Sequence, residues 1–310
     1  MEMLEARKKE LYFYSPYNFV RAFDYEAQLE NCVYSVIRDF HTQKNNRIIE
    51  IDVKGHKHEF LISFLPWDTN YFNINTYKLL YALYQHRDLK ILTEAVQLFM
   101  KELFKEKVYC FIEIPSEDIQ LIQALGSCGY QLIETRLTYF RGNLFSYNHQ
   151  RYPVRKADEE DALNLMRVAR EMRNDFDRFH ADDIFDKQIA DEFLATYIEQ
   201  SLRGFSDVVL TPNEPGLSSD SFLTAKYLKS EWDTNKIKIS KMVLSAVSSK
   251  ENKGWYKKLI SEMTYHLRDE GAEYIFMNTQ STNRAVLHTW GQLGYKVGCT
   301  RHVLSYNNYK

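Results

Sequence analysis

The sequence is poor in glycine, with 11 in 310 residues, about half of the usual ~7%. Phosphate-binding loops of the common nucleotide folds need glycines at fixed spacing, and neither G-x-G-x-x-G nor G-x-x-x-x-G-K-[ST] occurs. The four cysteines never approach C-x-x-C spacing, and the nine histidines include no H-E-x-x-H. These absences argue against a P-loop, a dinucleotide fold and a closed zinc site, so we predict no metal and reduced cysteines.

Excess charge and long apolar runs are lacking too. The 40 basic and 42 acidic side chains give a formal charge of -2, so no overall charge draws the chain to nucleic acid or to an anionic membrane. No run approaches about 18 apolar residues, and the first 20 residues contain no apolar core of a signal peptide. We therefore expect a cytoplasmic protein with neither nucleic-acid nor membrane partners.

What the sequence does contain suits a globular enzyme or binding protein. Hydrophobic residues make up 45% and aromatic residues 15% of the chain, a composition that supports a packed core and ligand pockets. At roughly 150 residues per domain, the length predicts about two domains.

Two segments 165 positions apart share the same order of residues. The matching positions are Phe111, Gly126, Gly129, Tyr130, Thr135 and Arg136 with Phe276, Gly291, Gly294, Tyr295, Thr300 and Arg301. Each copy predicts a strand, a helix, G-x-x-G-Y and a second strand. We expect the helices to be capped by Ser116 and Asn283 and to end at left-handed Gly129 and Gly294. The matching order favours duplication over coincidence.

Periodicity predicts an α/β protein around these copies. Upstream of the first copy we expect a strand, a turn at Pro66 and Asp68, and a helix over 92–105. A polar stretch near residue 150 places a domain boundary there, which gives an extension over 1–55, a partial repeat over 56–150 and a C-terminal domain over 151–310. The expected elements of the last part are strand 152–157, a helix opened by Asp158, helix 186–202, three strands within 208–249, helix 257–271 and strand 273–279.

This order of elements resembles the GNAT superfamily of acyl-CoA-dependent N-acyltransferases. The resemblance implies a mixed, mostly antiparallel sheet flanked by helices, with a partial GNAT-like repeat before it. It also places ENKGWYK at the family loop [QR]-x-x-G-x-[GA], where amides at a helix N-terminus hold the pyrophosphate of CoA. Gly254 matches this pattern, whereas Glu251 and Tyr256 depart from it.

The resemblance implies acetyl-CoA as co-substrate and a set of residues that contact it. Backbone N–H groups near Ala246 to Ser248 are expected to hold the oxyanion of the thioester, and lysines after Glu251 add positive charge. The implied acetyl-CoA contacts are Ala246, Val247, Ser248, Lys253, Gly254, Trp255, Tyr256, Lys257, Asn283 and Trp290, with Lys258 adding charge.

Within that superfamily, the segment TQSTNRAVLHTWGQLGY resembles the dTDP-fucosamine acetyltransferases, which acetylate a 4-amino-sugar nucleotide. NDFDRFHADDIF resembles the acceptor-side loop of that branch, and the likeness covers about 59–306. It implies an amine acceptor, of the dTDP-amino-sugar type, bound by Asp177, Arg178, Phe179 and His180. In this reading Arg178 holds a phosphate, Phe179 stacks on a ring and His180 accepts the proton of the amine; an ordinary solvated loop is the alternative.

The main departure is Trp290, which stands where the family places a tyrosine that protonates the leaving thiolate. An indole N–H is not a usable acid, so Tyr256 or a water is the substitute, and His180 and Tyr256 are the candidate catalytic residues. Two alternatives to this N-acetyltransferase stay open: a catalytically silent protein that binds CoA or a nucleotide sugar, and a tandem-GNAT aminoacyl transferase. A homodimer is also left open.

Overall fold

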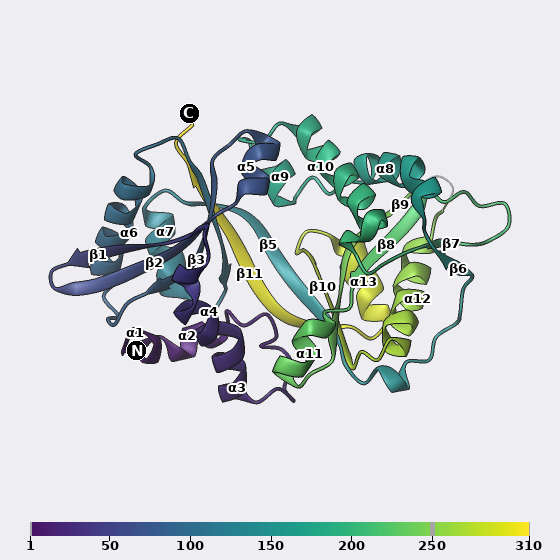
Figure 1. The fold of residues 1–310 in the computed structure, drawn as a ribbon, viewed down its shortest axis with the longest axis horizontal. Coiled ribbons are helices and arrows are strands. Elements are labelled where there is room, and N and C mark those ends of the chain that lie inside the picture. Colours follow the sequence, from purple (N-terminus) through teal and green to yellow (C-terminus); the bar gives the residue numbers. More distant parts are fainter. Residues whose placement is uncertain (1, 249–251, 310) are drawn as a thin grey trace. The chain divides into compact units, whose positions relative to one another are not determined.

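The computed structural model describes residues 2–248 and 252–309, and its ribbon is drawn in Figure 1. The chain forms two compact units. Unit 1 comprises residues 1–136 and 299–310, and unit 2 comprises residues 137–298. The chain passes between them within strands β5 (Gln131–Arg141) and β11 (Lys296–Asn307), so the units divide inside two strands and not in the polar stretch near residue 150.

The strands of unit 1 begin with a hairpin formed by β1 (Asn46–Val53) and β2 (His56–Phe64), within and just after the expected extension. Strand β3 (Thr76–Leu83) lies antiparallel to β2, and β4 (Tyr109–Pro115) lies parallel to β3. The last part of β11 completes this set, antiparallel to β4.

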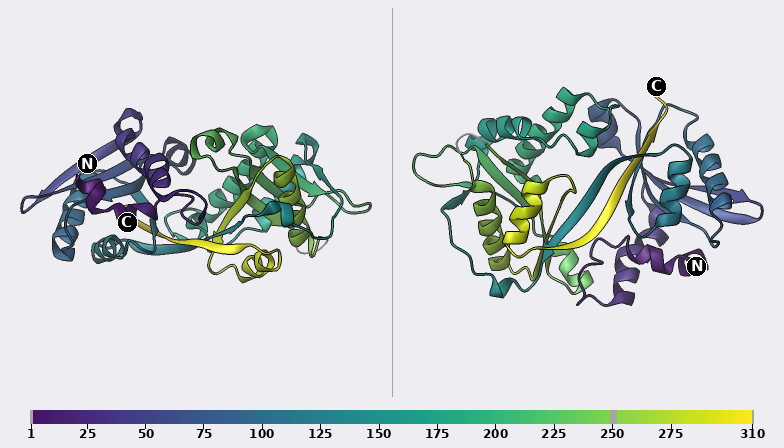
Figure 2. Two further views of the ribbon diagram at one scale, coloured as in Figure 1. Left: turned by 90° about the horizontal axis from the view of Figure 1, so that it is seen from below. Right: turned by 180° about the vertical axis from the view of Figure 1, so that it is seen from behind.

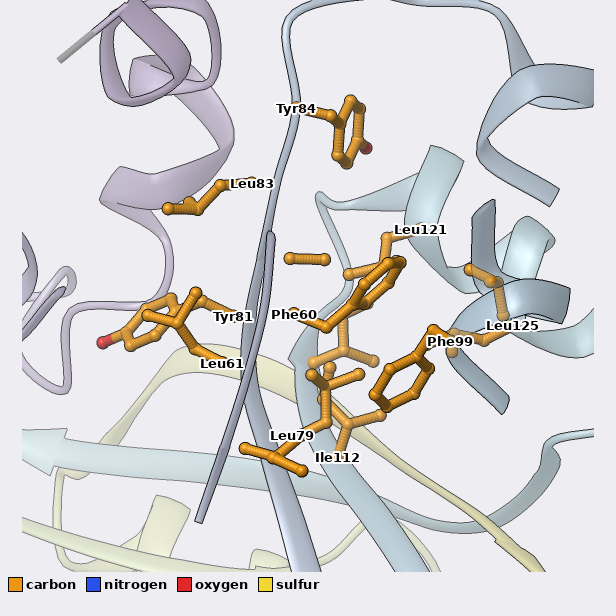
Figure 3. Close-up of a cluster of buried hydrophobic side chains, with 14 of the residues drawn as sticks. Phe60, Leu61, Leu79, Tyr81, Leu83, Tyr84, Phe99, Ile112, Leu121 and Leu125 are labelled. Atoms are coloured by element: carbon orange, nitrogen blue, oxygen red, sulfur yellow. The ribbon is translucent and has the colours of Figure 1, made fainter. Parts of the chain in front are cut away.

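Helices of unit 1 cover these strands. The longest, α6 (Leu89–Leu103), confirms the expected helix, and Asp88 caps it by accepting the amides of Lys90 and Ile91. Phe99 of α6 stacks on Phe60 of β2 with ring centroids 4.4 Å apart, in the core drawn in Figure 3. The other helices are α1 (Glu2–Ala6), α2 (Lys8–Tyr12), α3 (Tyr25–Leu29), the π-helical turn Glu30–Tyr34, α4 (Ser35–Arg38), the 3-10 turn Phe40–Thr42, α5 (Pro66–Phe72) and α7 (Ile119–Ser127).

Unit 2 is built around five strands, in the order β10-β9-β8-β7-β6. Four are antiparallel neighbours, and β10 is parallel to β9. Their bounds are β6 (Val154–Lys156), β7 (Val208–Pro212), β8 (Ser221–Lys226), β9 (Ile239–Val247) and β10 (Tyr274–Gln280). This mixed, mostly antiparallel sheet between helices confirms the predicted α/β architecture.

Helices pack on both faces of that sheet (Figures 1 and 2). Val208 and Leu210 of β7 pack in the core that contains α12 and α13, whereas Val209 between them packs with α8 and α10. This alternation follows from the period of two along a strand. The helices and helical turns of unit 2 are Leu144–Ser146, Glu159–Asp161, α8 (Ala162–Glu171), α9 (Arg178–Ala181), α10 (Lys187–Gln200), Ser201–Phe205, α11 (Lys229–Asn235), α12 (Trp255–Asp269) and α13 (Arg284–Gln292). Within the described ranges, no helix is long and apolar enough to cross a membrane.

The repeated helix ends were predicted in part. Gly129 and Gly294 adopt the left-handed conformation, with φ of 96° and 76°, as expected. The N-cap at Ser116 was wrong, whereas Asn283 does stand at the N-cap position. Helix α7 begins after Asp118, while the hydroxyl of Ser116 bonds to the carbonyl of Thr300; Asn283 occupies the cap position of α13 without a side-chain cap bond. Strand β4 continues to residue 115, which carries Ser116 away from the start of the helix.

Two histidines of unit 1, His58 and His86, make its stability sensitive to pH. His86 Nδ1 accepts the amide of Asp88, so its Nε2 carries the proton and donates to Nε2 of His58, 2.7 Å away. The ring of His56 lies 5.1 Å from that of His86. Burial, and then the neighbouring histidine, lowers the pKa of both His58 and His86.

A histidine with a depressed pKa in the folded state stabilises it fully above the unfolded value of about 6.5, and this stabilisation is lost as pH falls through the folded pKa. We therefore expect the melting temperature to fall between pH 7.5 and pH 5, and His86→Gln to reduce that fall. Circular dichroism at both pH values measures it, with the exposed His41→Gln as control. An unchanged pH dependence in His86→Gln would contradict the assignment.

Candidate functional site

The feature that shapes unit 2 is the separation of two neighbouring strands. Strand β10 pairs with β9 over three positions only, from Ile239 with Tyr274 to Lys241 with Phe276. Just beyond, β9 contains a bulge, since its register with β8 shifts between Leu223 and Ala225. A bulge leaves an extra residue unpaired and increases the local twist. The two strands therefore diverge after their third pair.

A cavity of about 290 Å³ lies where the strands diverge. It is lined by residues 242–247 of β9 and 277–280 of β10, together with residues of the helices on both faces. Its volume is near the lower end of the ~300–1,000 Å³ of ligand pockets. The cavity therefore suits the reacting ends of two substrates better than an entire nucleotide cofactor.

One hydroxyl in this cavity is held in place by an indole. Tyr256 in the first turn of α12 accepts a hydrogen bond of 2.8 Å from Nε1 of Trp290 on α13. Trp290 is buried and packs edge-on against Tyr139 at 5.2 Å. An indole only donates, so the hydroxyl of Tyr256 keeps its own proton for another partner. Burial raises the pKa of Tyr256 despite its bonds to Trp290 and Ser245, so it remains protonated at neutral pH.

The start of α12 has the backbone conformation that the predicted phosphate loop requires. Gly254 has a φ of 89°, and a Cβ on it would meet no atom within 4 Å, so its conformation and not the space around it favours glycine. Asn252 is fully buried and anchors the loop, with Nδ2 donating to Oγ of Ser221 at 2.9 Å. The loop residues 249–251, and with them the predicted position of Glu251, lie outside the described residues.

The lysines of this region are mostly engaged. Lys257 donates to Gln292 at 2.9 Å, and Lys258 pairs with Glu214 at 3.6 Å while lying over the ring of Trp255 at 4.4 Å. Lys253 is exposed. Of the lysines that the structure describes here, Lys253 is therefore the candidate contact for an anion approaching the start of α12.

The backbone amides expected to hold the oxyanion are not all available in the structure. The amide of Ser248 donates to the carbonyl of Asp220 at 3.1 Å, so it is already committed. Ala246 and Val247 line the cavity on the diverging part of β9. Backbone amides on that stretch are the remaining candidates.

The predicted acceptor loop is placed in two different environments. Asp177 lines the cavity and caps α9 by accepting the amides of Phe179 and His180. Arg178 is buried with its guanidinium over the ring of Phe179 at 4.1 Å, and Phe179 packs against Phe193 at 4.6 Å. Among the described lining residues, only Asp177 of the four predicted substrate contacts is present.

His180 is clamped between two carboxylates. Its Nδ1 lies 2.9 Å from Asp177 and its Nε2 lies 3.1 Å from Asp191. Burial lowers the pKa of His180, but Asp177 and Asp191 outweigh it, so the pKa is raised. Both ring nitrogens are engaged, which leaves no lone pair for the proton of an amine. Sequence reasoning suggested a base here, whereas the geometry is that of a buried imidazolium that orients Asp177.

The structure brings together six of the predicted site residues around the cavity: Asp177, Ala246, Val247, Tyr256, Asn283 and Trp290. It adds polar residues that sequence reasoning missed, notably Asn174, which donates to Gln280 across the cavity lining. For Gln280 the signal was the polar residues that follow the apolar core of β10, whereas Asn174, between α8 and α9, opens the segment NDFDRFHADDIF. Within the described part of the chain, no group of three His, Cys, Asp or Glu residues is placed to hold a metal ion.

Comparison of the sequence with protein-family models and with curated proteins finds no match. Comparison with solved structures does. A GCN5-related N-acetyltransferase from Sphaerobacter thermophilus superposes with a TM-score of 0.56 at 10% identity, covering 88% of this chain and 84% of the other. A GNAT-family acetyltransferase from Colwellia psychrerythraea gives 0.52 at 13% identity, covering 98% and 97%.

A third structure contains a glucosamine N-acetyltransferase region of a fungal multi-domain β-N-acetylglucosaminidase. It has a TM-score of 0.56 at 10% identity, and the match covers 97% of this chain and 37% of the other. Sequence identities of 10–13% establish a shared fold and nothing more. The chain has the GNAT fold.

Proposed function

We propose that the chain is an acyl-CoA-dependent N-acetyltransferase that works in the cavity of unit 2. The observation that carries this proposal is the divergence of β9 and β10 around a cavity containing a protonated hydroxyl, that of Tyr256. Diverging strands offer backbone amides to an acyl group, and the hydroxyl supplies the donor that a leaving thiolate needs. The GNAT fold of solved acetyltransferases supports the same conclusion.

Acetyl-CoA, held by the start of α12 and by β9, supplies an acetyl thioester. Attack by a neutral amine forms a C–N bond and breaks the C–S bond, so the amine loses a proton and the sulfur gains one. Backbone amides near Ala246 and Val247 donate to the carbonyl oxygen as it becomes negative. Tyr256 donates its O–H toward the sulfur, because Trp290 already occupies a lone pair of the same oxygen.

Asp177 is the carboxylate that faces the amine. It lines the cavity, and His180 fixes its orientation while Asp191 holds the opposite side of the imidazole. A carboxylate here attracts the ammonium form of an acceptor and takes up the proton released on reaction, directly or through a water. In this proposal His180 positions Asp177 and transfers no proton itself.

We propose an amino sugar as the acceptor. The cavity lining includes the amides of Asn174, Asn278 and Gln280, which suit hydroxyl groups. One structural neighbour is described as a glucosamine N-acetyltransferase region, and the sequence resemblance suggests a 4-amino-sugar nucleotide. Trp290, Glu251 and Tyr256 suggested the silent-binder alternative, and it is not favoured because two of them, Trp290 and Tyr256, together hold a hydroxyl in the cavity.

The first test removes the hydroxyl. In Tyr256→Phe we expect kcat to fall about a hundredfold or more, with the dissociation constant of acetyl-CoA unchanged. Thiol release from acetyl-CoA is followed with glucosamine and with a dTDP-4-amino-sugar as acceptors. Trp290→Phe, which frees the hydroxyl to reorient, is expected to lower kcat in the same direction but less. An unaltered kcat in Tyr256→Phe would rule out the hydroxyl as the donor.

The second test places a negative charge at the start of α12. Gly254→Glu is expected to weaken acetyl-CoA binding at least about tenfold relative to Gly254→Ala, because an anion at a helix N-terminus repels the pyrophosphate. Both variants adopt the same strained φ, so their difference isolates the charge. Calorimetric titration measures it. Equal affinities in the two variants would contradict the placement of the pyrophosphate.

A further inference from the structure

The parallel strand pair β3–β4 of unit 1 repeats the pair β9–β10 of unit 2. In unit 1 the ladder ends at Leu79 with Ile112, one position after Lys78 with Phe111, and in unit 2 it ends at Lys241 with Phe276. The ammonium of Lys78 lies 5.7 Å from the ring of Phe111, and that of Lys241 lies 5.6 Å from the ring of Phe276. The two lysines are therefore equivalent, at an offset of 163 residues.

The bulge is repeated as well. The register of β3 with β2 shifts between Leu61 with Tyr81 and Ile62 with Leu79, which leaves Leu80 as the extra residue. At the same offset Leu80 corresponds to Val243, within the bulge of β9. Unit 1 thus contains the same pair of strands that diverges at a bulge.

In unit 1 a side chain, that of Arg7, lies between the diverging strands, and a cavity of about 290 Å³ remains beside it, lined by Arg7, Tyr84 and Asp118 among others. Arg7, which is buried, donates to the carbonyl of Ala82 and to Asp118, and its guanidinium lies 4.3 Å from the ring centre of Tyr84. At the offset of 163, Ala82 and Tyr84 correspond to Ser245 and Val247. At the offset of 165 between the helices, Asp118 corresponds to Asn283.

Each of these three counterparts, Ser245, Val247 and Asn283, lines the cavity of unit 2. Arg7 therefore contacts in unit 1 the positions that surround the reacting groups in unit 2. The segment that carries Arg7 is firmly anchored.

Two further contacts hold that segment. The hydroxyl of Tyr14 donates to Asp118 at 2.7 Å. Arg301 of β11 donates to the carbonyls of Tyr14 and Ser15 at 2.9 and 3.0 Å. Leu11, between the two anchors, is fully buried in the core of unit 1.

We propose that the N-terminal segment, residues 2–21, is a built-in occupant of the acyl-donor cleft of the first repeat, and that the chain consequently has one acyl-CoA site. This inference rests on the proposed function for the site in unit 2. The guanidinium of Arg7 supplies hydrogen bonds where the strands diverge, and Asp118 neutralises it. The N-terminal extension thereby occupies the point of strand divergence in the degenerate copy of the site, and the cavity beside Arg7 is what remains of it.

The test uses the full chain in two measurements. The first is the stoichiometry of acetyl-CoA in calorimetric titration, for the wild type and for Gly254→Glu. The second uses a chain with a protease recognition sequence inserted between Arg21 and Ala22, both of which are exposed. After cleavage, retention of residues 2–21 is followed by gel filtration and mass spectrometry, for the wild-type segment, Arg7→Ala and the matched control Lys8→Ala.

We expect one acetyl-CoA per wild-type chain, weakening of that binding by at least about tenfold in Gly254→Glu, and retention of the cleaved segment in the wild type and Lys8→Ala. The Arg7→Ala segment should dissociate about a hundredfold faster or more, because it leaves the carboxylate of Asp118 buried without a cation. Two equivalents of acetyl-CoA, a full equivalent that binds Gly254→Glu with the wild-type affinity, or equal release of all three segments would overturn the inference. No binding to the wild type, with the segment retained, would contradict the proposed function while supporting the occupancy of the cleft.

Discussion

A parallel strand pair that diverges at a bulge leaves backbone N–H and C=O groups without the partners that a continuous ladder would provide. Buried groups of this kind need hydrogen bonds, so the space between the strands has to be filled by a ligand, by water or by the protein itself. The chain meets this requirement twice and in different ways. In unit 2 the divergence of β9 from β10 surrounds a cavity, and in unit 1 the divergence of β3 from β4 surrounds Arg7.

The pairing of Tyr256 with Trp290 places a hydroxyl in the cavity although the usual residue at position 290 is absent. The resemblance to GNAT enzymes leads one to expect a hydroxyl at position 290, where the chain has an indole. The structure places a hydroxyl from α12 against that indole, with the donor N–H of Trp290 fixing which way the proton of Tyr256 can point. A change of residue on one helix is thereby matched by a change on its neighbour, since the usual small residue at 256 would leave the indole N–H unpaired.

Much of the architecture could be predicted from local sequence. The apolar spacing of α6, the Asp186 that precedes α10 and the glycines at 129 and 294 each act through neighbouring residues, and each was identified correctly. The prediction that Ser116 caps a helix was wrong because the length of the preceding strand depends on its partners in the sheet, which the local sequence does not show. The engagement of both ring nitrogens of His180 could not be predicted for a similar reason. Asp191, which contacts the second nitrogen, comes from a different helix.

The N-terminal extension is the clearest case of a feature that sequence alone cannot place. Arg7 meets Ala82 and Asp118 across 75 and 111 residues of chain, and no periodicity links these positions. Only the repeated geometry of the two strand pairs reveals that the extension lies in unit 1 at the position where the second repeat, in unit 2, has its cavity. The internal repeat was visible in the sequence, but its consequence for the extension required the registers of the strands.

The most direct test of this proposal is a crystal structure of the full chain in complex with acetyl-CoA, which would show the position of the thioester sulfur. The account predicts one acetyl-CoA per chain, with its pyrophosphate at the start of α12, its sulfur within hydrogen-bonding reach of Tyr256 Oη, and Arg7 still bound to Ala82 and Asp118. Acetyl-CoA bound between β3 and β4, or a sulfur remote from Tyr256 in unit 2, would contradict it.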